Sequence, residues 1–343
     1  MAIRVAIMGF GRMGRNLFRA VHSDPDIDVV AINDIAGPES IEYLLQYDSL
    51  HGRFGEPVRV MDDVLYAGGR RIPILHEAEP RNVAWFDYGA DVVIEATGRY
   101  RTRAELEPHL ERGADRVLLT TPPRDEIDAV FIRGVSPGPI PREHRLISCG
   151  SSTANCVAVM LKTLDDAFGV EEAFFTSVHA YTTEQSLIDT PSPVNLRLSR
   201  AAMQNIVPVD SWTESGIEQL FPKLAGRFGG CKLNVPVPDT SCVDLVTTLE
   251  TDVRPEEINE IFRSAAGSTL KGIVDFTDEP IVSSDVADSR ASCTFDALAT
   301  MVVGGRMAKT LGWYAQGGGL AYRIVEVLRQ LAPKRMSGRA VEP

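Results

Sequence analysis

The feature that most constrains the fold of this 343-residue chain is a glycine-rich turn near its start. Gly9, Gly11 and Gly14 form the pattern GxGxxG, directly after the apolar run 1–10 and at the start of a segment with helical apolar spacing. In such a turn the glycines allow a tight bend and a close backbone approach, and the helix N-terminus holds a pyrophosphate. The pattern therefore predicts a dinucleotide site, to which Arg12 and Met13 also belong.

Asp34 supports this interpretation, since it ends a second apolar run, 27–34, and follows Gly14 by twenty residues. A carboxylate at the end of the second strand accepts hydrogen bonds from the adenosine ribose, and it repels a 2′-phosphate. The opening of the chain thus reads as a right-handed βαβ unit that prefers NAD to NADP. The alternative is a glycine-rich turn in an α/β domain that binds no nucleotide.

The rest of the chain shows two kinds of organisation. Strand-like runs at 90–98 and 115–123, with a helical pattern at 103–112 between them, continue the alternation typical of a doubly wound parallel sheet. After residue 150 a helix is predicted over 152–168, followed by long strand-like segments at 172–183, 229–250 and 296–314. Long strands without helices between them predict a mostly antiparallel second sheet. A last helical pattern covers 319–332, before a polar tail.

Charge and composition exclude several classes of function. The formal net charge is −12 and no long basic run is present, which argues against nucleic acid as a partner. No stretch approaches the roughly 20 apolar residues of a membrane span, and the N-terminus lacks the features of a signal peptide, so we expect a cytoplasmic protein with no membrane partner. The five cysteines are odd in number and lack metal-binding spacing, which predicts reduced thiols and no metal.

Ten ordered blocks carry a resemblance to a known family. They are GFGRMGR, VVAIND, QYDSLHGRF, EATGRYRTR, ISCGSSTANC, VHAYTTEQ, RAAMQNIVP, NVPVPDTSCVDL, CTFDA and GWY. Through them the chain resembles the glyceraldehyde-3-phosphate dehydrogenase family over nearly its whole length. The resemblance implies an α/β fold with a Rossmann NAD-binding domain at 1–150 and an α+β substrate domain at 151–315. It also implies a C-terminal helix at 316–335 that returns to the first domain, a tail at 336–343 and a homotetramer.

The resemblance also places the reacting groups. The family's ISNASCTTNC aligns without gaps on ISCGSSTANC, so Ser152 stands where the family has its catalytic cysteine, and His179 matches its catalytic histidine. A hydroxyl is a poor nucleophile without a base, which His179 could provide. Ser152 is therefore a nucleophile, a hydrogen-bond donor to the reacting oxygen, or only a helix cap. Cys149 either replaces the lost thiol or packs in the loop.

Further positions follow from the same alignment. Those implied to bind substrate are Ser151, Thr153, Thr182, Arg197, Ser211, Trp212 and Asn234. Asn234 stands where the family has an arginine, and asparagine lacks the charged, bidentate fork of that side chain. Those implied to bind the cofactor are Thr97, Gly98, Thr120 and, near the C-terminal helix, Gln316.

The sequence thus predicts an NAD-dependent oxidoreductase that acts on an aldehyde, oxo or alcohol substrate other than glyceraldehyde 3-phosphate. Because direct hydride transfer needs no covalent intermediate, serine would suffice beside an acid/base histidine. Two alternatives stay open. One is a catalytically deficient, NAD-binding relative that acts as a regulator or scaffold. The other is a phosphorylating dehydrogenase that uses Cys149.

Overall fold

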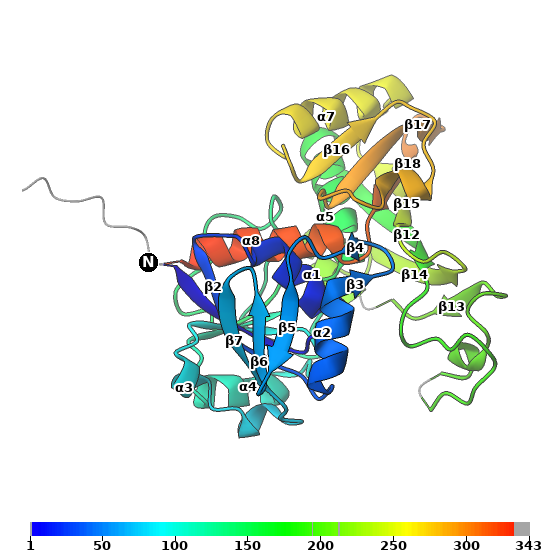
Figure 1. Ribbon diagram of the computed structural model, residues 1–343. Coiled ribbons are helices and arrows are strands. Elements are labelled where there is room, and N and C mark those ends of the chain that lie inside the picture. The colour runs from blue at the N-terminus through cyan, green and yellow to red at the C-terminus, as the bar shows by residue number, and fades with distance from the viewer. Residues whose placement is uncertain (1, 194, 212, 333–343) are drawn as a thin grey trace, which may run out of the picture.

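The structure of the protein is a computed structural model that describes residues 2–193, 195–211 and 213–332. Two large sheets form the cores of two lobes, one at the N-terminal side of the chain and one at the C-terminal side (Figure 1). The predicted tail, 336–343, and the predicted substrate residue Trp212 lie outside the described residues.

The N-terminal lobe is built on a nine-stranded sheet. In spatial order its strands are β10 (Ala129–Val130), β11 (Leu146–Ser148), β9 (Arg116–Leu119), β8 (Val92–Glu95), β1 (Ile3–Met8), β2 (Ile27–Asn33), β7 (Arg70–Leu75), β6 (Val64–Ala67) and β5 (Val58–Met61). All neighbours from β10 to β7 are parallel, while β7, β6 and β5 pair antiparallel. The predicted doubly wound parallel sheet is therefore confirmed, and strand order reverses at β1, where such folds bind ligands.

No helix or strand was predicted from the sequence between β2 and β8. The structure has there the helices α2 (Pro38–Gln46), α3 (Trp85–Tyr88) and η1 (Pro80–Asn82), the ribbon β3 (Tyr47–Asp48) with β4 (Gly52–Arg53), and β5 to β7. The β5–β6 hairpin turns through Asp62 and Asp63, whose φ angles are 50° and 53°. Since the usual signal for such a turn contains glycine, an Asp-Asp pair gave little sign of it.

The C-terminal lobe is built on a seven-stranded sheet. Its spatial order is β13 (Val207–Val209), β14 (Phe228–Val235), β12 (Val170–Ala180), β15 (Ser241–Leu249), β18 (Met307–Tyr314), β17 (Cys293–Val303) and β16 (Val274–Thr277). Only the β12–β14 and β16–β17 pairs are parallel. The predicted mostly antiparallel sheet is confirmed, but two of its predicted segments, 229–250 and 296–314, are each divided by a turn into two strands.

Helices complete both lobes. They are α1 (Arg12–Val21), α4 (Arg103–Glu111), α5 (Ser152–Phe168), α6 (Thr213–Leu220), α7 (Pro255–Gly267) and α8 (Gly318–Leu331), with the short turns η2 (Leu196–Ser199), η3 (Pro222–Leu224) and η4 (Ser283–Val286). Most of α5 is buried in the core of the C-terminal lobe.

The last helix, α8, crosses back to the N-terminal lobe and lies beside α1 (Figure 1). Its residues Leu320, Ile324 and Leu328 pack into the same apolar core as β1. The predicted return of the C-terminal helix is thus confirmed. Within the described ranges, the structure has no helix both long and apolar enough to cross a membrane.

Candidate active site

The glycine turn is shaped by close contacts of its backbone. Gly9 has a φ of 94°, and a Cβ atom on it would lie 2.7 Å from the amide nitrogen of Thr97. A Cβ atom on Gly14 would lie 2.1 Å from the carbonyl oxygen of Gly9, so the turn packs directly on α1. At Gly11, the N-cap of α1, the space is open, and no side chain caps the helix. The free amides of this helix end fit a pyrophosphate.

A pocket of about 280 Å³ lies beside this turn. It is lined by Met8, Gly9, Gly11, Asn33, Asp34, Ile35, Glu77, Ala78, Ala96, Thr97, Arg99 and Tyr100, at the carboxyl ends of β1, β2, β7 and β8. The Asp34 carboxylate accepts hydrogen bonds from the amides of Phe10, at 2.5 Å, and Ala36, at 2.8 Å. Asp34 is thereby held at the pocket wall, where the sequence analysis expected a ribose partner.

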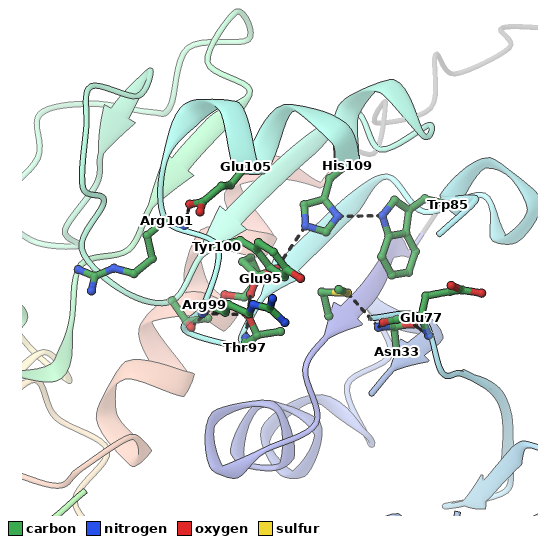
Figure 2. Close-up of polar contacts among 12 residues, drawn as sticks. Asn33, Glu77, Trp85, Glu95, Thr97, Arg99, Tyr100, Arg101, Glu105 and His109 are labelled. Carbon is green, nitrogen blue, oxygen red and sulfur yellow. Dashed lines mark hydrogen bonds and ion pairs between the residues drawn. The ribbon is translucent and has the colours of Figure 1, made fainter. Parts of the chain in front are cut away.

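Behind the pocket is a buried polar chain that the sequence analysis missed (Figure 2). Glu95 accepts hydrogen bonds from the amide, at 2.8 Å, and the hydroxyl of Thr97. Its other carboxylate oxygen lies 3.3 Å from Nε2 of His109, whose Nδ1 accepts a hydrogen bond from the Trp85 indole at 3.0 Å. Because Nδ1 accepts, Nε2 carries the ring proton and donates to Glu95. This chain fixes the loop that carries Thr97.

The remaining predicted cofactor residues lie around the same edge. Gly98 follows Thr97 with a φ of 70°, and the hydroxyl of Thr120 donates to the carbonyl oxygen of Glu95 at 3.0 Å. Met13, on the first turn of α1, packs half-buried against the N-terminal core. Thr120 is engaged with the backbone of β8, so it supports the loop from behind.

His179 lies near the end of β12 and is only 8% exposed. Its Nδ1 atom lies 2.6 Å from the carbonyl oxygen of Ala180. Since Nδ1 donates there, Nε2 of the neutral ring is left as an acceptor. Burial, together with the charges of Lys232 and Arg12, lowers the pKa of His179 to about 4, against the opposing effect of the Ala180 contact. At neutral pH the ring is uncharged and able to accept a proton.

Ser152 is the first residue of α5, and its hydroxyl accepts a hydrogen bond from the amide of Gly317 at 3.3 Å. The N-cap is the preceding residue, Ser151, which accepts from the amide of Ala154 at 3.1 Å. The interpretation of Ser152 as the helix cap is therefore wrong, because the β-region backbone that a cap needs occurs at Ser151.

The linker between β18 and α8 joins these parts of the site. The side-chain carbonyl oxygen of Gln316 accepts a hydrogen bond from the guanidinium of Arg12. The side-chain nitrogen Nε2 of Gln316 lies 3.3 Å from Nδ1 of His179. The backbone amide of Gln316 donates to Asp239 at 2.9 Å, which fixes the linker. Arg12 belongs to the glycine turn, and Ser152 contacts the next linker residue. The fold thus brings the dinucleotide turn, His179 and Ser152 to one place.

Of the predicted substrate residues, Thr153, Ser211 and Arg197 form a first group. Thr153 is bonded to Tyr314 through their hydroxyls at 2.7 Å, and Ser211 accepts from the amide of Thr213 at 3.2 Å, at the start of α6. Arg197 is exposed on η2, and its backbone amide donates to the side chain of Asn195, within the same turn. The structure does not connect Arg197 with His179.

Asn234 and Thr182 form the second group. The Asn234 amide donates to Oε1 of Gln185 at 2.7 Å, and the Thr182 backbone amide donates to the same oxygen at 3.3 Å. In the part of the chain that the structure describes, Oδ1 of Asn234, Oγ1 of Thr182 and Nε2 of Gln185 are buried without a partner. Asn234 is opposite His179 in the parallel pair of β12 and β14, so its side chain lies on the same sheet face as the His179 ring.

Cys149 is packed in the core of the N-terminal lobe with 1% of its surface exposed. Burial raises the pKa of its thiol to about 12. A nucleophilic cysteine needs the opposite, an exposed thiol with a lowered pKa. The geometry thus favours the packing role over the displaced nucleophile.

Comparison with known proteins gives a consistent result. The model "Glyceraldehyde 3-phosphate dehydrogenase, NAD binding domain" matches residues 3–103, and the model of the family's C-terminal domain matches residues 148–316. The glyceraldehyde-3-phosphate dehydrogenase of Geobacillus stearothermophilus is 40% identical over 335 residues, which cover 97% of this chain and 99% of that protein. Glyceraldehyde-3-phosphate dehydrogenase 2 of Bacillus subtilis is 39% identical over 99% of this chain and 100% of its own.

The chain belongs to the glyceraldehyde-3-phosphate dehydrogenase family. NAD is accordingly its cofactor, and the open helix end at Gly11 and the pocket at Asp34 provide room for that molecule. It is an NAD-dependent oxidoreductase of a family whose relatives act on an aldehyde. A glyceraldehyde-3-phosphate dehydrogenase from Streptomyces coelicolor, 41% identical over 95% of this chain and 98% of its own, extends the likeness to a second bacterial group.

Proposed function

We propose that this member of the glyceraldehyde-3-phosphate dehydrogenase family oxidises or reduces an aldehyde, hydrated carbonyl or alcohol other than glyceraldehyde 3-phosphate. His179 moves the proton, and Ser152 donates a hydrogen bond to the reacting oxygen. NAD, when bound, accepts or supplies the hydride. In oxidation, a C–H bond of the alcohol or hydrate breaks as hydride, its O–H proton passes to His179, and a C=O bond forms.

The observation that carries this proposal is the linker Gln316–Gly317, which contacts Arg12 of the cofactor turn, His179 and Ser152. His179 is joined to the cofactor turn through Gln316, and a base placed there suits direct hydride transfer. The proton and the hydride then leave the oxygen and the carbon of the same C–O group of the substrate. Among the described residues Nε2 of His179 has no hydrogen-bond partner, so it can accept the proton, and the low pKa keeps the ring uncharged. No step in this sequence requires a thiolate.

Two differences from the family support a substrate other than glyceraldehyde 3-phosphate: Ser152 in place of a cysteine and Asn234 in place of an arginine. A serine hydroxyl has a much higher pKa than a thiol, so a covalent route through Ser152 would be slow. At Asn234 the carbonyl oxygen Oδ1 is buried and unpaired within the described residues, and its partial negative charge would repel a phosphate oxygen. Both features disfavour the phosphorylated, thiol-dependent reaction of the relatives. Asp34 at the pocket wall supports NAD over NADP.

The role of Ser152 is tested by its replacement with alanine. We expect Ser152→Ala to lower kcat by about 10²-fold, the usual cost of losing one donor to a developing oxyanion. The melting temperature is expected to stay close to that of the wild type, because Ser151 caps α5. An unchanged kcat would contradict the role, and the absence of any phenotype in both Ser152→Ala and His179→Ala would favour the regulator or scaffold function.

We also propose a homotetramer. Exposed apolar side chains gather on the strands of the C-terminal sheet and on the loop between β12 and β13: Phe174, Leu298, Met301, Val303 and Met307 on the former, and Leu187, Ile188, Leu196, Met203 and Ile206 on the latter. Two separate apolar surfaces of this kind suit an assembly with more than one interface. Light scattering is expected to give about four times the chain mass, and a monomeric mass would contradict the proposal.

A further inference from the structure

Lys232 lies on the same sheet face as the general base. In the parallel pair of β12 and β14, Ser177 is opposite Lys232 and His179 is opposite Asn234. Opposed residues of parallel strands, and residues two apart on one strand, point to the same face. This face meets the start of α5, since Ser177 and Thr153 both bond to the hydroxyl of Tyr314, at 2.9 and 2.7 Å.

The ammonium of Lys232 has no hydrogen-bond or ion-pair partner among the described residues. Burial lowers its pKa, which the charge of the exposed Glu184 opposes without forming an ion pair. Lys232 is partly exposed, so its unpaired charge on this face is accessible to an anion and is attracted to it more strongly than in bulk water. Lys232 is thus a candidate binding group for an anion.

Asn234 shows where the anion does not bind. It is 1% exposed, and one N–H of its side-chain amide already donates to Gln185. The unpaired atom that remains, Oδ1, is an acceptor and attracts a hydroxyl or amide donor of the substrate. The Thr182 hydroxyl and Nε2 of Gln185 could donate to an oxyanion there but are uncharged, so the cation two residues earlier is the stronger partner.

We propose that Lys232 binds an oxyanion of the substrate, a carboxylate or a phosphate, beside His179, and that it determines substrate choice. This inference rests on the proposed function, whose substrate class it narrows to anionic aldehydes or alcohols. Lys232, the proposed anchor, is two residues from Asn234, which is about 7 Å along β14. A substrate anchored there presents a different carbon to His179 than one anchored at Asn234.

The first test needs no turnover. The His179 ring is followed by NMR while inorganic phosphate or succinate is added to the wild type, Lys232→Met and Lys271→Met, the last a control that removes an exposed lysine. The charged and titratable groups near His179 are Lys232 on β14, Arg12 on α1 and Tyr314 on β18. We expect Lys232→Met to raise the pKa of His179 and to weaken anion binding at least tenfold, whereas Lys271→Met changes neither.

The second test uses turnover of glyceraldehyde 3-phosphate, succinate semialdehyde and uncharged glyceraldehyde. Lys232→Met is expected to raise KM for the preferred anionic substrate about 10- to 100-fold, with a smaller effect on kcat and little on glyceraldehyde. Turnover of succinate semialdehyde identifies a carboxylate as the oxyanion, whereas preferred turnover of glyceraldehyde 3-phosphate would contradict the proposed function. Absent turnover with intact anion binding would overturn the proposed function alone. Unchanged anion affinity and unchanged His179 pKa in Lys232→Met would overturn the role of Lys232.

Discussion

His179→Gln is expected to lower kcat by about 10²- to 10⁴-fold, the range for loss of a general acid/base group. Glutamine keeps a polar side chain of similar size beside Gln316 but cannot accept a proton at neutral pH. NAD affinity is expected to change little, because His179 is not part of the glycine turn or its pocket. Stopped-flow or steady-state absorbance of the reduced cofactor measures the rate, and calorimetry measures the affinity.

The pH profile of the wild type completes this prediction. Burial disfavours the charged ring and lowers the pKa of His179 to about 4, from an ordinary value of 6.5. The base is therefore unprotonated above this value, and the acid limb of kcat/KM is expected near pH 4. A limb near pH 6.5, or a His179→Gln variant with wild-type kcat, would contradict the assignment of His179 as the base.

Gly14→Ala is expected to have the second large effect. Its methyl group would lie 2.1 Å from the carbonyl oxygen of Gly9, so the turn must move away from α1. We expect a loss of about 1–3 kcal/mol in the free energy of unfolding, the usual cost of overpacking. NAD affinity should fall by about 10- to 100-fold, or roughly 1.4–2.8 kcal/mol, because the helix amides shift.

Gly11→Ala is the matched control, since the space around Gly11 is open and its φ is −67°. We expect it to keep the wild-type melting temperature and to weaken NAD binding by occupying the space for the pyrophosphate. Equal stability of the Gly14→Ala and Gly11→Ala variants in thermal unfolding would contradict the close packing of the turn.

The parts of the fold predicted from sequence are those whose local signals agree with their final environment. The run 1–10, the glycine turn and the run 27–34 have apolar patterns that parallel strands keep in the folded core. The hairpin strands at 58–75 have exposed, polar positions, and their turn at Asp62–Asp63 lacks glycine; the Gly68–Gly69 turn was the one local hairpin signal there, and the sequence prediction missed it.

The candidate site shows a similar division. Ser152 and His179 could be located because they stand within ordered motifs of the family. Lys232 could not, because its position beside His179 depends on the register of β12 with β14, two strands far apart in the sequence. The contact of His109 could not be predicted either, because its bond to Glu95 depends on a strand and a helix that meet only in the fold.

The assignment of the helix cap also needed the structure. Serines 151 and 152 are equally good cap residues by type, and only backbone conformation distinguishes them. The cap at Ser151 leaves the hydroxyl of Ser152 within reach of the linker at Gly317. This position is what makes a hydrogen-bond role for Ser152 chemically reasonable in a site without a catalytic thiol.

The central claim, hydride transfer to NAD without a nucleophilic thiol, is tested most directly by an absorbance assay before and after treatment with iodoacetamide. A panel of anionic and neutral aldehydes and alcohols is offered with NAD, with and without inorganic phosphate. We predict turnover that needs no phosphate, survives alkylation and disappears in His179→Gln. Turnover that requires phosphate and stops on alkylation would contradict the claim and restore a thiol mechanism through Cys149.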